Sequence, residues 1–300
     1  MAPILSLKNI SKSYGRIKAL QDVSFDVPEG AVFGILGPNG SGKTTLLGIV
    51  MDVLIASSGI YTWFGNPPSE NQRREIGTLL ETPNFYHYLS AQHNLEIAAL
   101  IKHKPADDIE RVLKLVRLYE RRNSKFQTYS LGMKQRLAIA ACLLGNPSVL
   151  VFDEPTNVLD PSGIAELRQL IIDLAAAGKT IILASHLLAE VEKVCTHVAI
   201  LQQGVLIKSG DVLSALSQEV WLELGSSDMA GLHEILERLP GIKKIIRQGN
   251  HFQVYFIDSM PDADQINRHC FENNVVLNFL QVMKKSLESA FIELTDNVSN

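Results

Sequence analysis

The sequence predicts an α/β protein with a mixed, largely parallel sheet, followed by a small α+β domain. Three observations predict this fold class. Strand-like and helix-like segments alternate from residue 148 to residue 201, a pattern typical of a parallel sheet with crossover helices. The runs SVLVF and TIILAS are continuously apolar, as expected of strands that are covered on both faces. Composition changes near residues 216–218, which indicates a domain boundary.

The first 145 residues predict strands and then a helical subdomain. Short strands are expected at ILSLKNI, VSFDV and AVFGIL, with a turn at residues 28–30. A helix should run from about residue 42 to residue 53, and two strands, GIYTWFG and EIGTLL, follow it. Further helices are expected at about 91–101, 106–119 and 131–144. Gly145 and Pro147 should end the last of these, with glycine just past the helix and proline beyond it.

The last third of the chain predicts a domain of its own. Its segments follow the order strand, helix, strand, strand, helix, strand, with a final helix at SLESAFIEL. This βαββαβ order favours a small ferredoxin-like domain. We therefore expect a first domain at 1–217, including a helical subdomain at about 82–145, and a second domain at 218–300.

Composition excludes several classes of protein. With 46% hydrophobic and 20% charged residues, the chain can bury substantial cores and is not typical of a disordered protein. The net charge of −4 argues against a nucleic-acid partner, which normally requires a basic surface. Three widely spaced cysteines favour a reducing compartment over a disulfide framework or zinc site. Neither a signal peptide nor an apolar run of membrane-spanning length is evident.

The segment GPNGSGKTT matches the pattern G-x-x-x-x-G-K-[ST] and lies between a predicted strand and a predicted helix. In such a loop, backbone N–H groups surround a phosphate and the helix N-terminus adds its positive dipole. Lys43 would reach the β- and γ-phosphates, and the Thr44 hydroxyl would bind Mg²⁺. The candidate nucleotide-binding residues here are Gly37, Pro38, Asn39, Gly40, Ser41, Gly42, Lys43, Thr44 and Thr45.

A pair of acidic residues follows the buried strand of VLVFDEP. Asp153 and Glu154 stand at its carboxyl end, which is where ligands bind in α/β sheets. Asp153 is therefore a candidate to hold the metal ion. Glu154 is a candidate general base that activates the water attacking the γ-phosphate.

The segments GPNGSGKTT, YSLGMKQR, VFDEPTNVLDP and ASH occur in this order, and their combination strongly resembles the ATP-binding-cassette (ABC) ATPases. The resemblance covers residues 4 to about 216 and implies a P-loop NTPase fold of the ABC type. The segment SLESAFIEL resembles the end of ATPases that serve ABC-2-type exporters of drugs and antibiotics. ATP and Mg²⁺ are the cofactors that the resemblance implies.

The resemblance assigns YSLGMKQR to the signature helix, which faces the nucleotide of the other subunit. Ser130 and Gly132 match this motif, and a serine N-cap on a core helix is the ordinary structural role of the same residue. Two complete sites then require two cassettes, and we expect a homodimer. Leu131 and Met133 replace the usual glycine and glutamine, so Leu131 would crowd the phosphate unless its side chain points away.

Four other residues take roles from the resemblance. His186 matches the switch histidine that contacts the γ-phosphate, and Asp160 matches the D-loop aspartate. Asp160 with Pro161 is also a typical helix start, and we expect both roles. Tyr14 matches the aromatic residue that stacks on adenine. Glu81 stands where the family has the Q-loop glutamine; its carboxylate can bind Mg²⁺ but cannot donate a hydrogen bond as glutamine does.

The function that the sequence predicts is an ATP-hydrolysing subunit that powers separate integral membrane subunits of an exporter from the cytoplasmic face of the cell membrane. The segment TPNFYHYLSAQHNL resembles the region that docks those subunits, although ordinary packing explains it equally well. The alternative is a soluble ABC mechanoenzyme acting on nucleic acid or ribosomes. A single cassette, no room for a coiled-coil insertion between Lys43 and Ser130, and the acidic charge balance disfavour it. A nucleotide-binding regulator without turnover is disfavoured by the intact Asp153–Glu154 pair.

Overall fold

The computed structural model describes residues 3–80, 84–157, 159–212, 220–257, 263–284 and 287–296. The chain divides into two compact units, Met1–Ala215 together with Phe291–Asn300, and Leu216–Ala290. The boundary that we expected between residues 217 and 218 falls outside the described residues. The first unit takes in Phe291–Asn300, and the domain bounds 1–217 and 218–300 stay a prediction.

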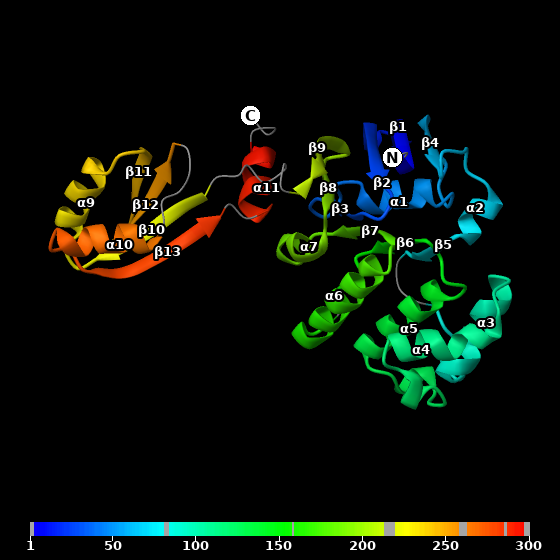
Figure 1. Ribbon diagram of the computed structural model, residues 1–300. Coiled ribbons are helices and arrows are strands. Elements are labelled where there is room, and N and C mark those ends of the chain that lie inside the picture. The colour runs from blue at the N-terminus through cyan, green and yellow to red at the C-terminus, as the bar shows by residue number, and fades with distance from the viewer. Residues whose placement is uncertain are drawn as a thin grey trace. The chain divides into compact units, whose positions relative to one another are not determined.

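The first unit contains a mixed sheet, as predicted (Figure 1). Within the described residues its nine strands lie in the order β4-β1-β2-β9-β8-β3-β7-β6-β5. The strands are β1 (Pro3–Tyr14), β2 (Ile17–Pro28), β3 (Val32–Leu36), β4 (Ser58–Trp63), β5 (Ile76–Leu79), β6 (Val149–Asp153), β7 (Thr180–Ser185), β8 (His197–Gln202) and β9 (Val205–Asp211). Adjacent strands in the run β8-β3-β7-β6-β5 are parallel, while β9 is antiparallel to β8 and β1 pairs antiparallel with β2 and β4.

The central strands are buried along their whole length, which explains their continuous apolar sequences. Every residue of β3, β6 and β7 is buried. Strands β1 and β2 each span 12 residues and are longer than predicted, because polar residues on their exposed positions continue the ladder beyond the apolar runs. Strand β9 was not predicted, since it is antiparallel to β8 and only partly buried.

Helices of the first unit follow the predicted order. They are α1 (Lys43–Val50), α2 (Glu70–Arg74), α3 (Ala91–Ile101), α4 (Ile109–Leu115), α5 (Leu131–Leu143), α6 (Pro161–Ala176) and α7 (Leu188–Val194). Helices α1, α4 and α5 are shorter than predicted, α3 has the predicted bounds, and α2 was not predicted. Left-handed residues explain two early ends: Asp52, with φ 60°, follows α1, and Arg117, with φ 55°, follows α4. Helices α3, α4 and α5 lie together beside the sheet (Figure 1). No helix among the described residues has both the length and the apolar character needed to cross a bilayer.

The second unit has the predicted βαββαβ order. Its elements are β10 (Val220–Ser226), α9 (Met229–Arg238), β11 (Ile242–Gln248), β12 (His251–Phe256), α10 (Ala263–Glu272) and β13 (Leu277–Lys284), and α11 (Leu287–Asp296) follows. The described strands form one antiparallel sheet in the order β11-β12-β10-β13. Side chains of β10 and β12 pack with those of α9 and α10 in a separate core. The name ferredoxin-like stays our interpretation of this order.

Candidate functional site

The loop between β3 and α1 has two positions that only glycine can occupy. A Cβ on Gly37 would lie 2.3 Å from the carbonyl oxygen of Leu201 and 2.4 Å from Ser41 Oγ. Gly42, the N-cap of α1, has φ 105°, and a Cβ there would lie 2.6 Å from the carbonyl oxygen of Ala19. The backbone is therefore packed tightly at the point where α1 begins, and this is the geometry in which N–H groups at a helix start bind an anion.

The other predicted residues of this loop differ in burial. Pro38, Asn39, Gly40 and Thr44 are exposed, Thr45 is half-buried and Ser41 is buried. Within the described residues, Ser41 Oγ is a buried oxygen that has no hydrogen-bond partner. Because buried polar atoms normally find a partner, this oxygen fits a loop that completes its hydrogen bonds with a polar ligand.

Lys43 is the first residue of α1, and its side chain folds back into the loop. It is 5% exposed, and its Nζ donates hydrogen bonds to the carbonyl oxygens of Gly37 at 2.8 Å and Pro38 at 3.2 Å. The same ammonium group lies 3.5 Å from Glu154 Oε1. The positive charge is thus held at the centre of the loop, beside the predicted catalytic carboxylate.

Three neighbouring strands bring the predicted catalytic residues together. Strands β3, β7 and β6 are adjacent in the sheet, and Lys43, His186 and Glu154 follow their carboxyl ends. His186 Nδ1 lies 2.8 Å from Glu154 Oε2, a hydrogen-bond distance. Glu154 therefore has one oxygen beside the lysine and the other beside the histidine. This grouping at the edge of a parallel sheet is where α/β proteins bind ligands.

The backbone of Glu154 is strained. Its φ of 46° is left-handed, a conformation that costs a non-glycine residue about 1–3 kcal/mol. Two hydrogen bonds hold it: Glu154 N donates to Ala184 O at 3.0 Å, and Asn157 N donates to Glu154 O at 3.1 Å. The sheet and the following turn thus fix the direction in which this carboxylate points.

The residues predicted to hold a metal ion are only partly described. Asp153 ends β6 and is 7% exposed, and Thr44 lies in the first turn of α1. Glu81 lies outside the described residues. Among the residues that the structure does describe, no group of three or more His, Cys, Asp or Glu side chains could bind a metal on its own. A carboxylate and a hydroxyl are the oxygen donors that Mg²⁺ uses when phosphates complete its shell, so the residues present fit this ion.

The signature segment begins α5 as predicted. Ser130 is the N-cap, and its Oγ accepts a hydrogen bond from Met133 N at 3.3 Å. A Cβ on Gly132 would lie 3.5 Å from Leu159 Cδ2, which is ordinary contact, so the chain passes here without crowding. Ser130 therefore has its structural role, and the helix start carries the partial positive charge of its free N–H groups.

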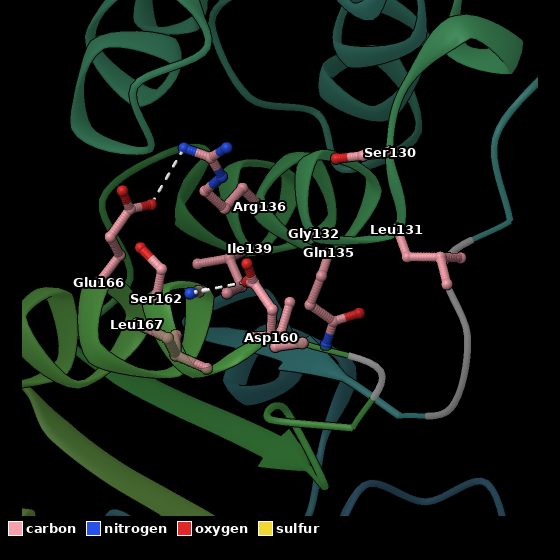
Figure 2. A pocket seen from close by; sticks show the side chains of 12 residues that line it. Ser130, Leu131, Gly132, Gln135, Arg136, Ile139, Asp160, Ser162, Glu166 and Leu167 are labelled. Atoms are coloured by element: carbon pink, nitrogen blue, oxygen red, sulfur yellow. Dashed lines mark hydrogen bonds and ion pairs between the residues drawn. The ribbon is translucent and has the colours of Figure 1, made fainter.

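A cavity of about 400 Å³ lies between α5 and the start of α6 (Figure 2). Ser130, Gly132, Gln135 and Asp160 line it, whereas no residue of the 37–45 loop does. Leu131 is 58% exposed, and its side chain points away from Gln135 and Asp160 (Figure 2). The leucine that replaces the usual glycine thus leaves the start of the helix open.

Asp160 has the helix-capping role predicted for it, and Tyr14 is exposed at the end of its strand. Asp160 is the N-cap of α6, its Oδ1 accepts a hydrogen bond from Gly163 N at 2.9 Å, and Pro161 follows at the first helical position. Tyr14 ends β1 and is 46% exposed. Lys12 Nζ lies 5.1 Å from the centre of the Tyr14 ring, a cation–π contact that holds the ring in place.

Two contacts of α5 were not predicted. Gln135 is 7% exposed, and its Nε2 donates a hydrogen bond to Pro155 O at 3.1 Å. Arg136 Nη1 lies 3.2 Å from Glu166 Oε2 on α6. The signal in the sequence is a polar residue, Gln135, at a helix position that the apolar pattern would otherwise bury.

Comparisons with known proteins agree with this geometry. The family model described as ABC transporter matches residues 20–157. An uncharacterized ABC transporter ATP-binding protein, YhcH of Bacillus subtilis (strain 168), is 42% identical over 98% of this chain and 97% of its own length. The bacitracin transport ATP-binding protein BcrA of Bacillus licheniformis is 34% identical over 98% of both chains.

Solved structures agree as well. The ATP-binding cassette MJ0796, in a dimeric post-hydrolysis state bound to ADP and Pi, is 27% identical with a TM-score of 0.63. The alignment covers 69% of this chain and 98% of that one. The range of the family match, residues 20–157, contains the 37–45 loop, the Asp153–Glu154 pair and the signature helix. The chain therefore belongs to the ABC transporter family, as the ATP-binding subunit that hydrolyses ATP.

Proposed function

We propose that this chain is the ATPase of an exporter and works as a head-to-tail homodimer, with each ATP between the 37–45 loop of one copy and the Ser130–Gly132 segment of the other. The observation that carries the proposal is the separation of two half-sites. Glu154 contacts both Lys43 and His186, whereas Ser130, Gly132 and Asp160 line a separate cavity. Each half-site lacks what the other contains, so a second copy is required to complete either one.

Binding of ATP begins with Lys43. Its Nζ now donates to two carbonyl oxygens of its own loop and lies beside Glu154. In the bound state the ammonium group turns to the β- and γ-phosphate oxygens, which are stronger acceptors because they are charged. The backbone N–H groups of residues 37–45 surround the phosphates, and Tyr14 stacks on adenine.

Thr44 and Asp153, with Glu81, are the residues that would hold Mg²⁺, and the bound ion would neutralise charge on the phosphates. Glu154 then accepts a proton from the water that attacks the γ-phosphate. His186 holds the γ-phosphate from the side of β7 and keeps Glu154 Oε2 oriented at 2.8 Å. Ser130 and Gly132 of the other copy donate to the same phosphate through a hydroxyl and a backbone N–H.

The membrane partner and the direction of transport rest on the relatives. BcrA is named as a bacitracin transport protein, and it resembles this chain along 98% of the length of each. This supports an exporter whose separate membrane subunits bind the chain at the cytoplasmic face of the membrane. Two exposed aromatic side chains, Tyr86 at 51% and Tyr88 at 65%, offer a surface for such a subunit.

Complementation between two inactive variants tests the head-to-tail pair. Lys43→Ala removes the ammonium group from the 37–45 loop, and Ser130→Arg fills the cavity beside the signature helix. Each variant alone should therefore hydrolyse almost no ATP. In a mixed dimer, the intact 37–45 loop of one copy meets the intact signature helix of the other, and turnover should return. A mixture of Lys43→Ala with Glu154→Gln serves as the control. Both changes damage the half-site that contains Lys43 and Glu154, so no mixed dimer has a complete site. Failure of the first mixture to recover phosphate release would overturn the proposal.

A further inference from the structure

We infer that Gln135 is a positioning residue that connects the signature helix to the catalytic base of its own chain, so that contact with the nucleotide in one site sets the base in the other. The inference rests on the proposed head-to-tail dimer. It assigns a role to Gln135, which lines the cavity beside Ser130 but has no part in the ATP binding or turnover described above. Its basis is a single buried hydrogen bond that joins two functional segments.

The first step is the contact itself. Gln135 Nε2 donates to Pro155 O at 3.1 Å, and Gln135 is 7% exposed. Figure 2 shows the side chain pointing from α5 toward the chain between β6 and α6. A buried hydrogen bond of this kind resists breaking, because a donor or acceptor left without a partner would cost about 1–3 kcal/mol. The two segments therefore move together.

The second step concerns the helix end of the contact. Ser130 is the N-cap of α5 and Gln135 lies in its second turn, about 7 Å farther along the axis at the usual rise per residue. A helix this short between the two residues behaves as a rigid body. A shift of Ser130 toward a γ-phosphate in the opposite site is therefore passed to the Gln135 amide almost unchanged.

The third step concerns the base. Pro155 directly follows Glu154, whose φ is 46° and whose backbone is held by Ala184 O and Asn157 N. Proline has no N–H, so the carbonyl of Pro155 is its backbone hydrogen-bonding group. The rest of the chain can hold the Pro155 backbone by a hydrogen bond through this group. The Pro155 carbonyl belongs to the peptide between Pro155 and Thr156. Because the proline ring fixes φ, a displacement of this carbonyl is passed through the ring to the Glu154–Pro155 peptide and moves the carboxylate relative to Lys43 and His186.

A neighbouring contact provides the matched control. Arg136 on the same helix pairs with Glu166 of α6 at 3.2 Å, so it also fastens α5 to an element outside the helical subdomain. This pair does not contact the 154–157 segment. Glu166→Gln should weaken the ion pair between α5 and α6 without changing the position of Glu154. Its effect on turnover should therefore stay within about twofold.

The first arm of the test separates positioning from folding. Gln135→Met keeps the size of the side chain and removes the donor, and Gln135→His restores a donor the same number of bonds from Cβ. We expect the methionine variant to lower kcat roughly 10- to 100-fold, the loss typical of a slightly misplaced catalytic group, with little change in KM for ATP. The histidine variant should recover most of that loss. Combined with Glu154→Gln, the methionine variant should still form an ATP-dependent dimer in size-exclusion chromatography, since the binding groups are intact.

The second arm tests the connection between sites by a double-mutant cycle. Ser130→Ala should lower kcat by a larger factor in the natural chain than in the Gln135→Met background, because the methionine variant has already lost the connection. An equal factor in both backgrounds would overturn the inference while leaving the proposed dimer intact. An absence of any effect of Ser130→Ala in the natural chain would instead overturn the proposed trans contact, and the inference with it. Loss of the dimer in the methionine variant would show a structural role and would also overturn it.

Discussion

Lys43 Nζ lies 3.5 Å from Glu154 Oε1, and the two side chains are only 5% and 16% exposed. The strands that these residues follow, β3 and β6, are not neighbours in the sheet. Strand β7 lies between β3 and β6, and it places His186 against the second oxygen of the same carboxylate. The ammonium group that would bind phosphate therefore pairs with the carboxylate that would accept the proton. Arrival of the phosphates would draw the lysine away and free the base at the same moment.

Replacement of Glu154 by glutamine keeps the shape of the side chain and removes the carboxylate that we propose accepts the proton. We expect Glu154→Gln to bind ATP at least as tightly as the natural chain and to lose turnover roughly 10²–10⁴-fold. Equilibrium nucleotide binding and phosphate release measure the two effects. Glu110→Gln, which alters an exposed carboxylate on α4, is the control and should leave both unchanged. A Glu154→Gln protein that hydrolyses ATP at the natural rate would remove Glu154 from the reaction.

Removal of the Tyr14 ring should weaken ATP binding without affecting the fold. The ring is 46% exposed and contacts Lys12, so one face is available to a base. Stacking of a base on an aromatic ring contributes about 1–3 kcal/mol, and Tyr14→Ala should raise the Kd for ATP accordingly. Tyr14→Phe keeps the ring and should bind ATP normally. Unchanged affinity in the alanine variant would exclude stacking at this position.

Two glycines of the 37–45 loop should differ in their tolerance of a methyl group. A Cβ on Gly37 would lie 2.3 Å from a backbone oxygen, whereas a Cβ on Gly40 meets nothing within 4 Å. Gly40→Ala should cost only the strain of a left-handed alanine, about 1–2 kcal/mol. Gly37→Ala should lower the free energy of unfolding by about 3 kcal/mol, because the backbone itself must shift. Chemical denaturation of the nucleotide-free variants compares them, and equal losses would contradict the packing described for Gly37.

The stability of the helical subdomain should depend on pH through Asp108. Its carboxylate accepts hydrogen bonds from Arg111 at 2.5 and 2.8 Å and from Gly145 N at 2.7 Å. The hydrogen bond from Arg111 lowers the pKa of Asp108, so its stabilising effect is present above the pKa of the unfolded chain and is lost as the pH falls through the folded value.

Asp108→Asn should therefore lower the free energy of unfolding at neutral pH by about 1–2 kcal/mol, and the difference from the natural chain should shrink in acid. Denaturant unfolding at neutral and at acidic pH measures both values. Glu110→Gln changes an exposed carboxylate of the same helix, one that pairs with Lys114, and should have a smaller effect at each pH. A constant difference across the pH range would show that the charge of Asp108 has no part in the stability.

Local sequence was sufficient to predict the strands and helix starts that carry the candidate site residues. The apolar runs that end in Asp153 and Ser185, and the glycine pattern at 37–42, predict strands with polar ends, and the structure places those ends at one edge of the sheet. Helix starts at Ser130 and Asp160 were predictable for the same reason, since a capping side chain acts on backbone groups only three residues away.

Contacts between distant segments could not be predicted in this way. The bond from Gln135 to Pro155 and the pair of Lys43 with Glu154 depend on which strands are neighbours, and no local pattern encodes that order. Strand β9 was missed because it pairs with β8 through a polar, half-exposed sequence without a continuous apolar run. The bound at residue 119 was wrong because a single left-handed residue, Arg117, ended the helix early.

Leu131 gives the dimer face a property that a glycine in this position would not provide. The side chain is 58% exposed and stands next to Ser130, on a surface that pairing would cover. Burying part of a leucine would add about 1–2 kcal/mol of association per copy, and salt would weaken this term far less than it weakens charge contacts. This apolar contact does not depend on the phosphates and would persist after hydrolysis, so the natural dimer would reopen more slowly than a Leu131→Gly dimer.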